Sequence, residues 1–128
     1  EGIEPQIVVC KVDHDGHYQI GDVVTQLMSL PQMPTTIACQ EDGIALPLLF
    51  QLERNGFAVP GDISLIGYDD SFYTNDIGLT TIRQDPAEMA RTAARMTLDL
   101  IQGHELSPAF VDVPAQLVVR SSTASVRH

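Results

Sequence analysis

The apolar residues of this chain alternate between two spacings, and this alternation constrains the fold more than any other feature. Short runs rich in β-branched residues, typical of buried strands, fall at residues 6–12, 35–39, 63–68, 79–84 and 115–121. Apolar residues three or four positions apart, the spacing of amphipathic helices, fall at residues 18–30, 41–54 and 86–102. Alternating strands and helices predict the α/β class, with a parallel sheet and helices on both faces.

Capping and helix-breaking residues refine the predicted helices. Asp85, Pro86 and Glu88 combine an Asp cap, a proline at the first helical position and a glutamate three residues after the cap. This arrangement predicts a reciprocal capping box at the start of the helix over residues 86–102. Asp42 is predicted to cap the preceding helix, and Pro47 predicts a kink or a later start within it.

The composition excludes several classes of protein. The chain has 128 residues, the size of one domain, and a formal charge of −10 with only seven basic residues, which are scattered. A polyanion such as DNA needs a positive surface, so this chain alone is not expected to bind nucleic acid. No run of 18 apolar residues is present, so no membrane span is expected. Cys10 and Cys39 lie in apolar runs and are expected to be reduced, buried thiols in the cytoplasm, although a disulfide is possible.

Polar clusters follow three of the predicted strands, at residues 40–42, 69–71 and 84–85. The carboxyl ends of parallel strands meet at one edge of a sheet, where ligands of open α/β folds bind. The clusters therefore predict one shared site. Aspartate also favours the bend after a strand, so turn chemistry is the alternative explanation of the pair Asp69 and Asp70.

Enzyme chemistry has no support in the motifs. Ser71 has no histidine partner in an obvious arrangement, and neither a nucleophile elbow nor a glycine-rich nucleotide motif is present. The cysteine and histidine spacing matches no zinc site, and the paired carboxylates lack the further oxygen ligands of a divalent cation site. We expect no catalytic residues, no metal and no cofactor.

The stretch from Pro34 to Thr123 resembles the C-terminal part of the lactose/galactose-repressor family of bacterial transcription regulators. The segments that carry the resemblance are PTTIACQEDGIAL, NGFAVPGDISLIGYDD, LTTIRQDPAEMA and PAQLVVRSST, and the VPGDISLIGYDD block is the most specific. The resemblance implies the two-lobed fold of type I periplasmic sugar-binding proteins, with a sugar or related effector held between the lobes. It implies the effector-sensing part of a cytoplasmic DNA-binding repressor. The alternative is a periplasmic solute-binding protein for sugar transport, which shares the fold and the cleft.

The resemblance also implies the site residues. Asp69 matches the aspartate that accepts hydrogen bonds from ligand hydroxyls, and Gln84 matches the second contact. Glu41 stands where the family usually has asparagine, and a carboxylate there can accept but not donate. His17 or Tyr18 matches a contact that the family places in the loop after the first strand of this region.

The family's chains are more than twice as long as this one. The whole chain, 1–128, therefore resembles the C-terminal portion of the effector-binding domain, an incomplete two-lobed domain whose 86–102 helix crosses to the other lobe. Operator DNA would be bound only through an N-terminal domain that this sequence lacks. Apolar residues left off the predicted core, Leu46, Phe50, Phe72 and Tyr73, are expected to form a homodimer interface. Exchange of the 86–102 helix between copies, or a monomer with that helix folded back, are the alternatives.

Overall fold

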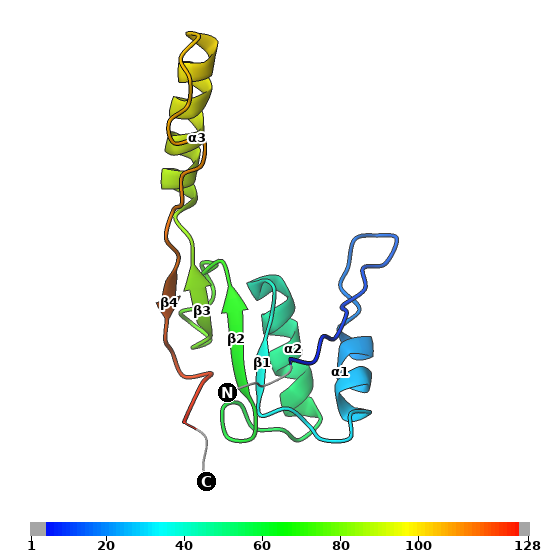
Figure 1. Cartoon of the computed structure of the whole chain (residues 1–128). Coiled ribbons are helices and arrows are strands. Elements are labelled where there is room, and N and C mark those ends of the chain that lie inside the picture. The colour runs from blue at the N-terminus through cyan, green and yellow to red at the C-terminus, as the bar shows by residue number, and fades with distance from the viewer. Residues whose placement is uncertain (1–4, 126–128) are drawn as a thin grey trace.

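A computed structural model of the chain describes residues 5–125 (Figure 1). Within this range the elements in chain order are α1 (Ile20–Met28), β1 (Thr36–Ala38), α2 (Asp42–Arg54), β2 (Ser64–Tyr68), β3 (Thr80–Arg83), α3 (Pro86–Ile101) and β4 (Gln116–Val118). All three predicted helices are present, and so are the last four of the predicted strands.

The strands form one sheet in the order β1-β2-β3-β4. The first three strands are parallel, whereas β4 is antiparallel to β3. The α/β class is confirmed, but the sheet is mixed rather than purely parallel. Figure 1 shows the reason: α3 rises from the carboxyl end of β3, and the chain then returns past that end before it enters β4.

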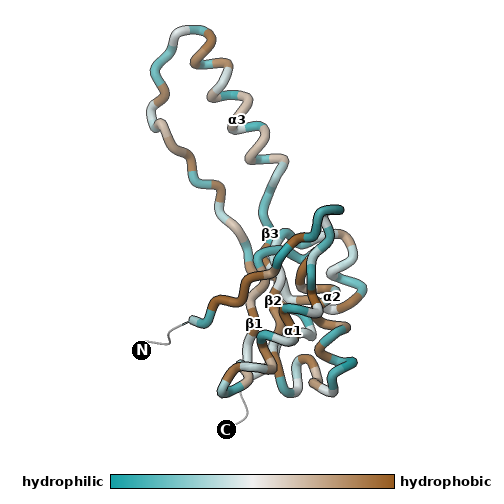
Figure 2. Tube along the Cα trace, turned by 90° about the vertical axis from the view of Figure 1, so that its right-hand side faces the viewer, coloured by the Kyte–Doolittle hydropathy of each residue, from teal (hydrophilic) through white to brown (hydrophobic). Residues whose placement is uncertain are grey.

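The hydrophobic core lies between the sheet and two helices. α2 packs against β2, and α1 packs against α2. Figure 2 shows both helices on one side of the sheet. The buried side chains include Leu65 from β2, Leu48 and Leu52 from α2, and Leu27 from α1. Within residues 5–125 the helices that pack on the sheet thus cover one face, not the two that were predicted.

α3 stands apart from this core, as Figure 1 shows. No residue of α3 is buried, and Leu98 and Ile101 are 57% and 76% exposed. The Asp85 carboxylate accepts a hydrogen bond from the Glu88 amide at 2.8 Å, so the predicted cap is confirmed. The Glu88 carboxylate, however, pairs with Arg91 further along the helix, so no hydrogen bond in the structure supports the reciprocal half of the capping box.

The predicted strand over residues 6–12 is wrong. An isolated antiparallel bridge between Val12 and Tyr18 is the β-structure that this part of the chain forms. Ile7 and Val9 are 86% and 61% exposed. A run of β-branched and apolar residues makes a segment suitable for a strand, but a strand also needs a hydrogen-bonded neighbour, and none of the described strands pairs with this segment.

The start of α2 differs from the prediction in two ways. The helix begins at Asp42 and runs through Pro47 to Arg54, so the proline does not delay its start. The N-cap residue is Glu41, which makes no side-chain capping bond, so the prediction that Asp42 caps the helix is wrong. Asp42 is instead the first helical residue, and its side chain is fully buried.

The two cysteines are free thiols. Both Cys10 and Cys39 pack against the core and are partly buried. Burial raises the pKa of the Cys39 thiol to about 12, so this sulfur stays protonated at neutral pH. No helix in the described part of the chain is long and apolar enough to cross a bilayer.

Candidate ligand-binding site at the edge of the sheet

Asp69 and Gln84, the two principal predicted contacts, lie together. The Gln84 carboxamide donates to Asp69 Oδ1 at 3.0 Å, and the Asp69 amide donates to the Ile82 carbonyl at 2.8 Å. The two residues follow neighbouring parallel strands, which is why their side chains meet at the carboxyl edge of the sheet. Asp69 is exposed and has φ of 105°, a left-handed conformation that is uncommon for a residue with a side chain. Such positions recur at ligand-binding sites.

Asp42 connects the start of α2 to its surroundings at this edge. Its buried carboxylate accepts hydrogen bonds from the Ser71 amide at 2.7 Å and from Thr81 Oγ1 at 2.8 Å. These bonds join the start of α2 to β3 and to the loop after β2. Gly67 in β2 makes room for them, because a Cβ at that position would overlap the Asp42 carboxylate. Because Asp42 is held by these hydrogen bonds, the preceding residue, Glu41, also lies at this edge.

Asp70 has a different role from its neighbour. Its carboxylate accepts from Arg83 Nε at 2.6 Å, from Arg120 Nη2 at 2.7 Å and from Thr74 Oγ1 at 3.0 Å. Burial acts to raise the pKa of Asp70, but the hydrogen bonds from Arg120, Arg83 and Thr74 outweigh it and hold the pKa at about 2. Asp70 is thus the structural residue that turn chemistry predicted, although its two arginine partners were not predicted.

The two acidic pairs are therefore divided in the same way. In each pair one carboxylate, of Asp42 or Asp70, is held inside the fold by hydrogen bonds. The other carboxylate, of Glu41 or Asp69, forms no ion pair with any residue between 5 and 125. The resemblance had separated Asp69 and Glu41 from their neighbours, and the structure shows which bonds hold those neighbours, Asp42 and Asp70, inside the fold.

Glu41 and Tyr18 also come together. A hydrogen bond with the Glu41 carboxylate is the main reason why the pKa of the Tyr18 phenol is raised, with burial and the charge of Glu41 adding to it. The carboxylate bends back over the start of α2, where its Oε1 lies 2.8 Å from the position that a Cβ on Gly43 would take. The absence of a side chain at Gly43 therefore lets Glu41 adopt this position.

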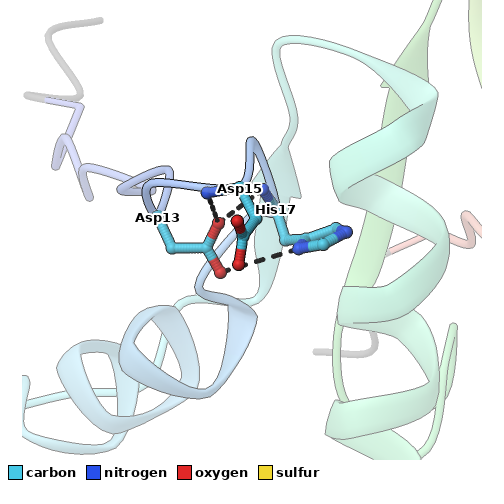
Figure 3. Close-up of side chains that lie close together, drawn as sticks. All are labelled: Asp13, Asp15 and His17. Atoms are coloured by element: carbon cyan, nitrogen blue, oxygen red, sulfur yellow. Dashed lines mark hydrogen bonds and ion pairs between the residues drawn. The ribbon is translucent and has the colours of Figure 1, made fainter.

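His17 lies in a different cluster, with Asp13 and Asp15 (Figure 3). The ligand atoms of these three residues lie within 4.8 Å of one another, a spacing that a metal ion could use. The Asp13 carboxylate, however, already accepts from the amides of Asp15 and His17 at 2.9 Å and from Gln19 Nε2 at 3.0 Å. These bonds explain the cluster as the internal structure of a surface loop. No contact in the structure joins His17 to Asp69 or Gln84.

A shallow hollow of about 240 Å³ borders Gln84. Its lining comes from the end of β3, the start of α3 and the segment before β4: Arg83, Gln84, Asp85, Glu88, Val113, Pro114 and Gln116. Asp69, Glu41 and Tyr18 are not part of this lining. The site in this chain is thus an open edge with an adjoining hollow rather than an enclosed cavity.

The residues predicted for a dimer interface differ in exposure. Phe50 is 51% exposed and Phe72 is 93% exposed. Phe72 packs edge-to-face on Tyr73, with ring centroids 5.2 Å apart. Leu46 is partly buried on α2. The aromatic residues, more than Leu46, supply the exposed apolar surface.

An α/β sheet with polar side chains gathered at the carboxyl ends of its parallel strands is typical of proteins that bind small ligands at that edge. Comparison with known proteins places the chain within this class. The family described as "Periplasmic binding protein-like domain" matches residues 1–123. The chain belongs to this family.

The relatives are transcriptional regulators. The chain is 39% identical over 103 residues to the HTH-type transcriptional repressor CytR of Escherichia coli K12, a match that covers 79% of this chain and 30% of CytR. The lac repressor dimer bound to operator and the anti-inducer ONPF superimposes with a TM-score of 0.66 at 29% identity, covering 84% of this chain and 36% of that one. A LacI-family regulator from Lactobacillus casei with bound sucrose gives a TM-score of 0.65 at 28% identity, covering 81% and 39%.

These matches confirm the resemblance inferred from the sequence. They also show that the chain spans only about a third of the length of the relatives it matches. This partial coverage of the relatives' chains fits an incomplete domain.

Proposed function

We propose that this chain is the C-terminal part of the effector-binding domain of a LacI-type transcriptional repressor that acts in the cytoplasm. In this proposal the protein is a sensor of a sugar or related small molecule and not an enzyme. The observation that carries the proposal is the hydrogen-bonded pair of Asp69, which is exposed, and Gln84, which is half-buried, at the carboxyl edge of the sheet. The relatives of this chain are repressors and LacI-type regulators, which favours a regulator over a periplasmic solute-binding protein.

The proposed contacts have distinct roles. Asp69 accepts hydrogen bonds from two ligand hydroxyls, since one carboxylate can take two donors. The Gln84 carboxamide donates one hydrogen bond to Asp69 and keeps a second N–H and its oxygen for the ligand. Glu41 and Tyr18 form the other end of the site, and His17 in the neighbouring loop is the remaining member of the proposed set.

Effector binding would act by shifting a conformational equilibrium. A ligand that contacts this edge and the opposing lobe stabilises one arrangement of the lobes, and the shift changes the affinity for operator DNA. Operator contact is assigned to the DNA-binding part of the full regulator. The formal charge of −10 on this chain supports that division, because like charges repel the phosphate backbone.

We further propose that the regulator is a homodimer through a surface formed by Leu46, Phe50, Phe72 and Tyr73. The support is the exposed aromatic surface, since large exposed apolar side chains on neighbouring elements are typical of interfaces. The similar lac repressor structure is a dimer. Exchange of the 86–102 helix between copies remains the second form, because no residue of α3 is buried within its own chain.

Amide chemical-shift mapping tests the site. The isotope-labelled protein is titrated with a panel of neutral monosaccharides, disaccharides and nucleosides, each up to about 10 mM, a concentration that detects weak binding. We expect shifts at the amides of Asp69, Ser71 and Gln84, and loss of those shifts in Asp69→Asn. Shifts that leave this edge unchanged, or no shifts with any compound, would contradict the proposed function.

A further inference from the structure

The proposed site carries two negative charges that no cation of the described chain balances. Glu41 and Asp69 make no ion pair, whereas Asp70 takes both nearby guanidinium groups, those of Arg83 and Arg120. Each arginine donates to the structural carboxylate of Asp70, and the half-exposed Arg83 side chain also lines the hollow beside Gln84. A ligand at this edge meets two free carboxylates, a phenol and a carboxamide.

The backbone next to Glu41 is anchored. The adjacent Asp42 is locked to Ser71 and Thr81 by hydrogen bonds of 2.7 and 2.8 Å. The Glu41 carboxylate occupies the space that Gly43 leaves open, and its proximity raises the pKa of the Tyr18 phenol. Both observations place the Glu41 carboxylate over the start of α2.

The chemistry of these groups limits the ligand. Carboxylates accept hydrogen bonds and donate none, so the ligand must supply the donors. A phosphate or carboxylate group at this edge would face two like charges, which suppresses binding, whereas an ammonium group would form a charge-assisted hydrogen bond. Hydroxyl groups are compatible with either position.

We propose that Glu41 determines the specificity of this site: with Asp69 it selects a polyhydroxylated ligand that carries an amino group and rejects phosphorylated or carboxylated ones. The inference rests on the proposed function, because it concerns the ligand class of that same site. It adds a residue whose charge, rather than its shape, discriminates among ligands.

Matched ligands separate the effect of charge from that of shape. The protein is titrated calorimetrically with three sets, based on glucose, galactose and ribose, each comprising the neutral sugar, its 2-amino derivative and its terminal phosphate ester. For at least one set we expect the amino sugar to bind about tenfold more tightly than the neutral sugar, and the phosphate ester to bind at least about tenfold more weakly. Glu41→Gln keeps the size of the side chain and should reduce both ratios to within about threefold.

Glu53→Gln is the matched control, because it removes the same charge from an exposed position near the other end of α2. It should leave both ratios unchanged. The inference is overturned if the phosphate ester binds as tightly as the neutral sugar, or if Glu41→Gln leaves the ratios of the wild type. If either of these results is found but Asp69→Asn abolishes binding, the inference about Glu41 fails and the proposed function still stands. If no compound binds the wild type at about 10 mM, the proposed function fails and the inference fails with it.

Discussion

Gln84 donates a hydrogen bond of 3.0 Å to Asp69, although 15 residues separate them in the sequence. The contact exists because β2 and β3 are parallel neighbours, so that the residues following each strand emerge at the same edge. The neighbouring carboxylates hold this edge together. Asp42 accepts hydrogen bonds from the Ser71 amide and from Thr81, and Asp70 pairs with Arg83 and Arg120. Asp42 and Asp70 thus anchor the edge, while Asp69 and Gln84 present polar groups on it, an arrangement that suits a binding site.

Asp70→Asn should destabilise the fold. The pKa of Asp70 is lowered from 3.8 to about 2, so this carboxylate contributes stability that is fully present above pH 4 and is lost as the pH falls toward 2. A shift of this size corresponds to about 2 kcal/mol at neutral pH. Urea unfolding at pH 7 should show that loss, and the difference from the wild type should shrink as the pH is lowered from 5 to 3, a range set by these values.

Asp69→Asn is the control for this measurement, because the neighbouring carboxylate is exposed and makes no ion pair in the structure. Its stability at pH 7 should equal that of the wild type within about 0.5 kcal/mol. Equal destabilisation by the two variants would contradict the division of roles within the pair.

Gly67→Ala should destabilise the protein because the new Cβ would overlap the Asp42 carboxylate and lie 3.0 Å from Leu79 Cδ2. Overpacking of a buried position costs about 1–3 kcal/mol. Gly21→Ala in α1 is the matched control, since a Cβ there meets nothing within 4 Å and alanine favours the helix. In thermal unfolding, Gly67→Ala should lower the melting temperature and Gly21→Ala should raise it. A Gly67→Ala variant as stable as the wild type would refute the close contact between Gly67 and Asp42.

Asp85→Ala should loosen α3 locally. The Asp85 carboxylate satisfies the Glu88 amide at 2.8 Å, and loss of such a cap costs about 0.5–2 kcal/mol. Because no residue of α3 is buried, hydrogen exchange of its amides is the sensitive measurement. Glu88→Gln should change exchange less, since Glu88 makes no return bond to the cap. Unchanged exchange in Asp85→Ala would show that the cap does not stabilise this helix.

Sedimentation tests the proposed dimer. At about 100 μM, a concentration that reveals weak association, we expect a dimer. Phe50→Glu and Leu46→Glu should each give a monomer if α2 forms the interface, whereas a dimer formed by exchange of the 86–102 helix would persist in both. Circular dichroism confirms that each variant is folded. A wild-type chain that sediments as a single monomer would exclude both forms.

The sequence predicted the positions of helices and strands better than the pairing and direction of the strands. Helix spacing and caps located α1, α2 and α3, and β-branched runs located the strands that pair within the chain. The segment 6–12 has the same pattern but no partner, and a pattern of side chains cannot show whether a neighbouring strand is available. The direction of β4 was likewise undetermined, because it depends on the path of the chain beyond α3.

The candidate site was predicted only in part. Asp69 and Gln84 follow strands whose order is easily inferred, so their contact was predictable. The resemblance separated Asp69 from Asp70, but the partners of Asp42 and Asp70 lie far away in the sequence and were not predicted. Only the structure shows that Asp42 is buried against Thr81 rather than capping a helix. The isolated Gly67 in a strand was a signal that could have pointed to this close approach.

The most direct test of the account is calorimetric titration of the wild type and Asp69→Asn with the tightest-binding compound of the sugar and nucleoside panel. Asp69→Asn removes the charge and keeps the size of the side chain. The account predicts that affinity falls by about 2–4 kcal/mol, or roughly 30-fold to 1,000-fold, because a charge-assisted pair of hydrogen bonds is lost. An affinity within about threefold of the wild type would show that Asp69 does not bind the effector and would contradict the account.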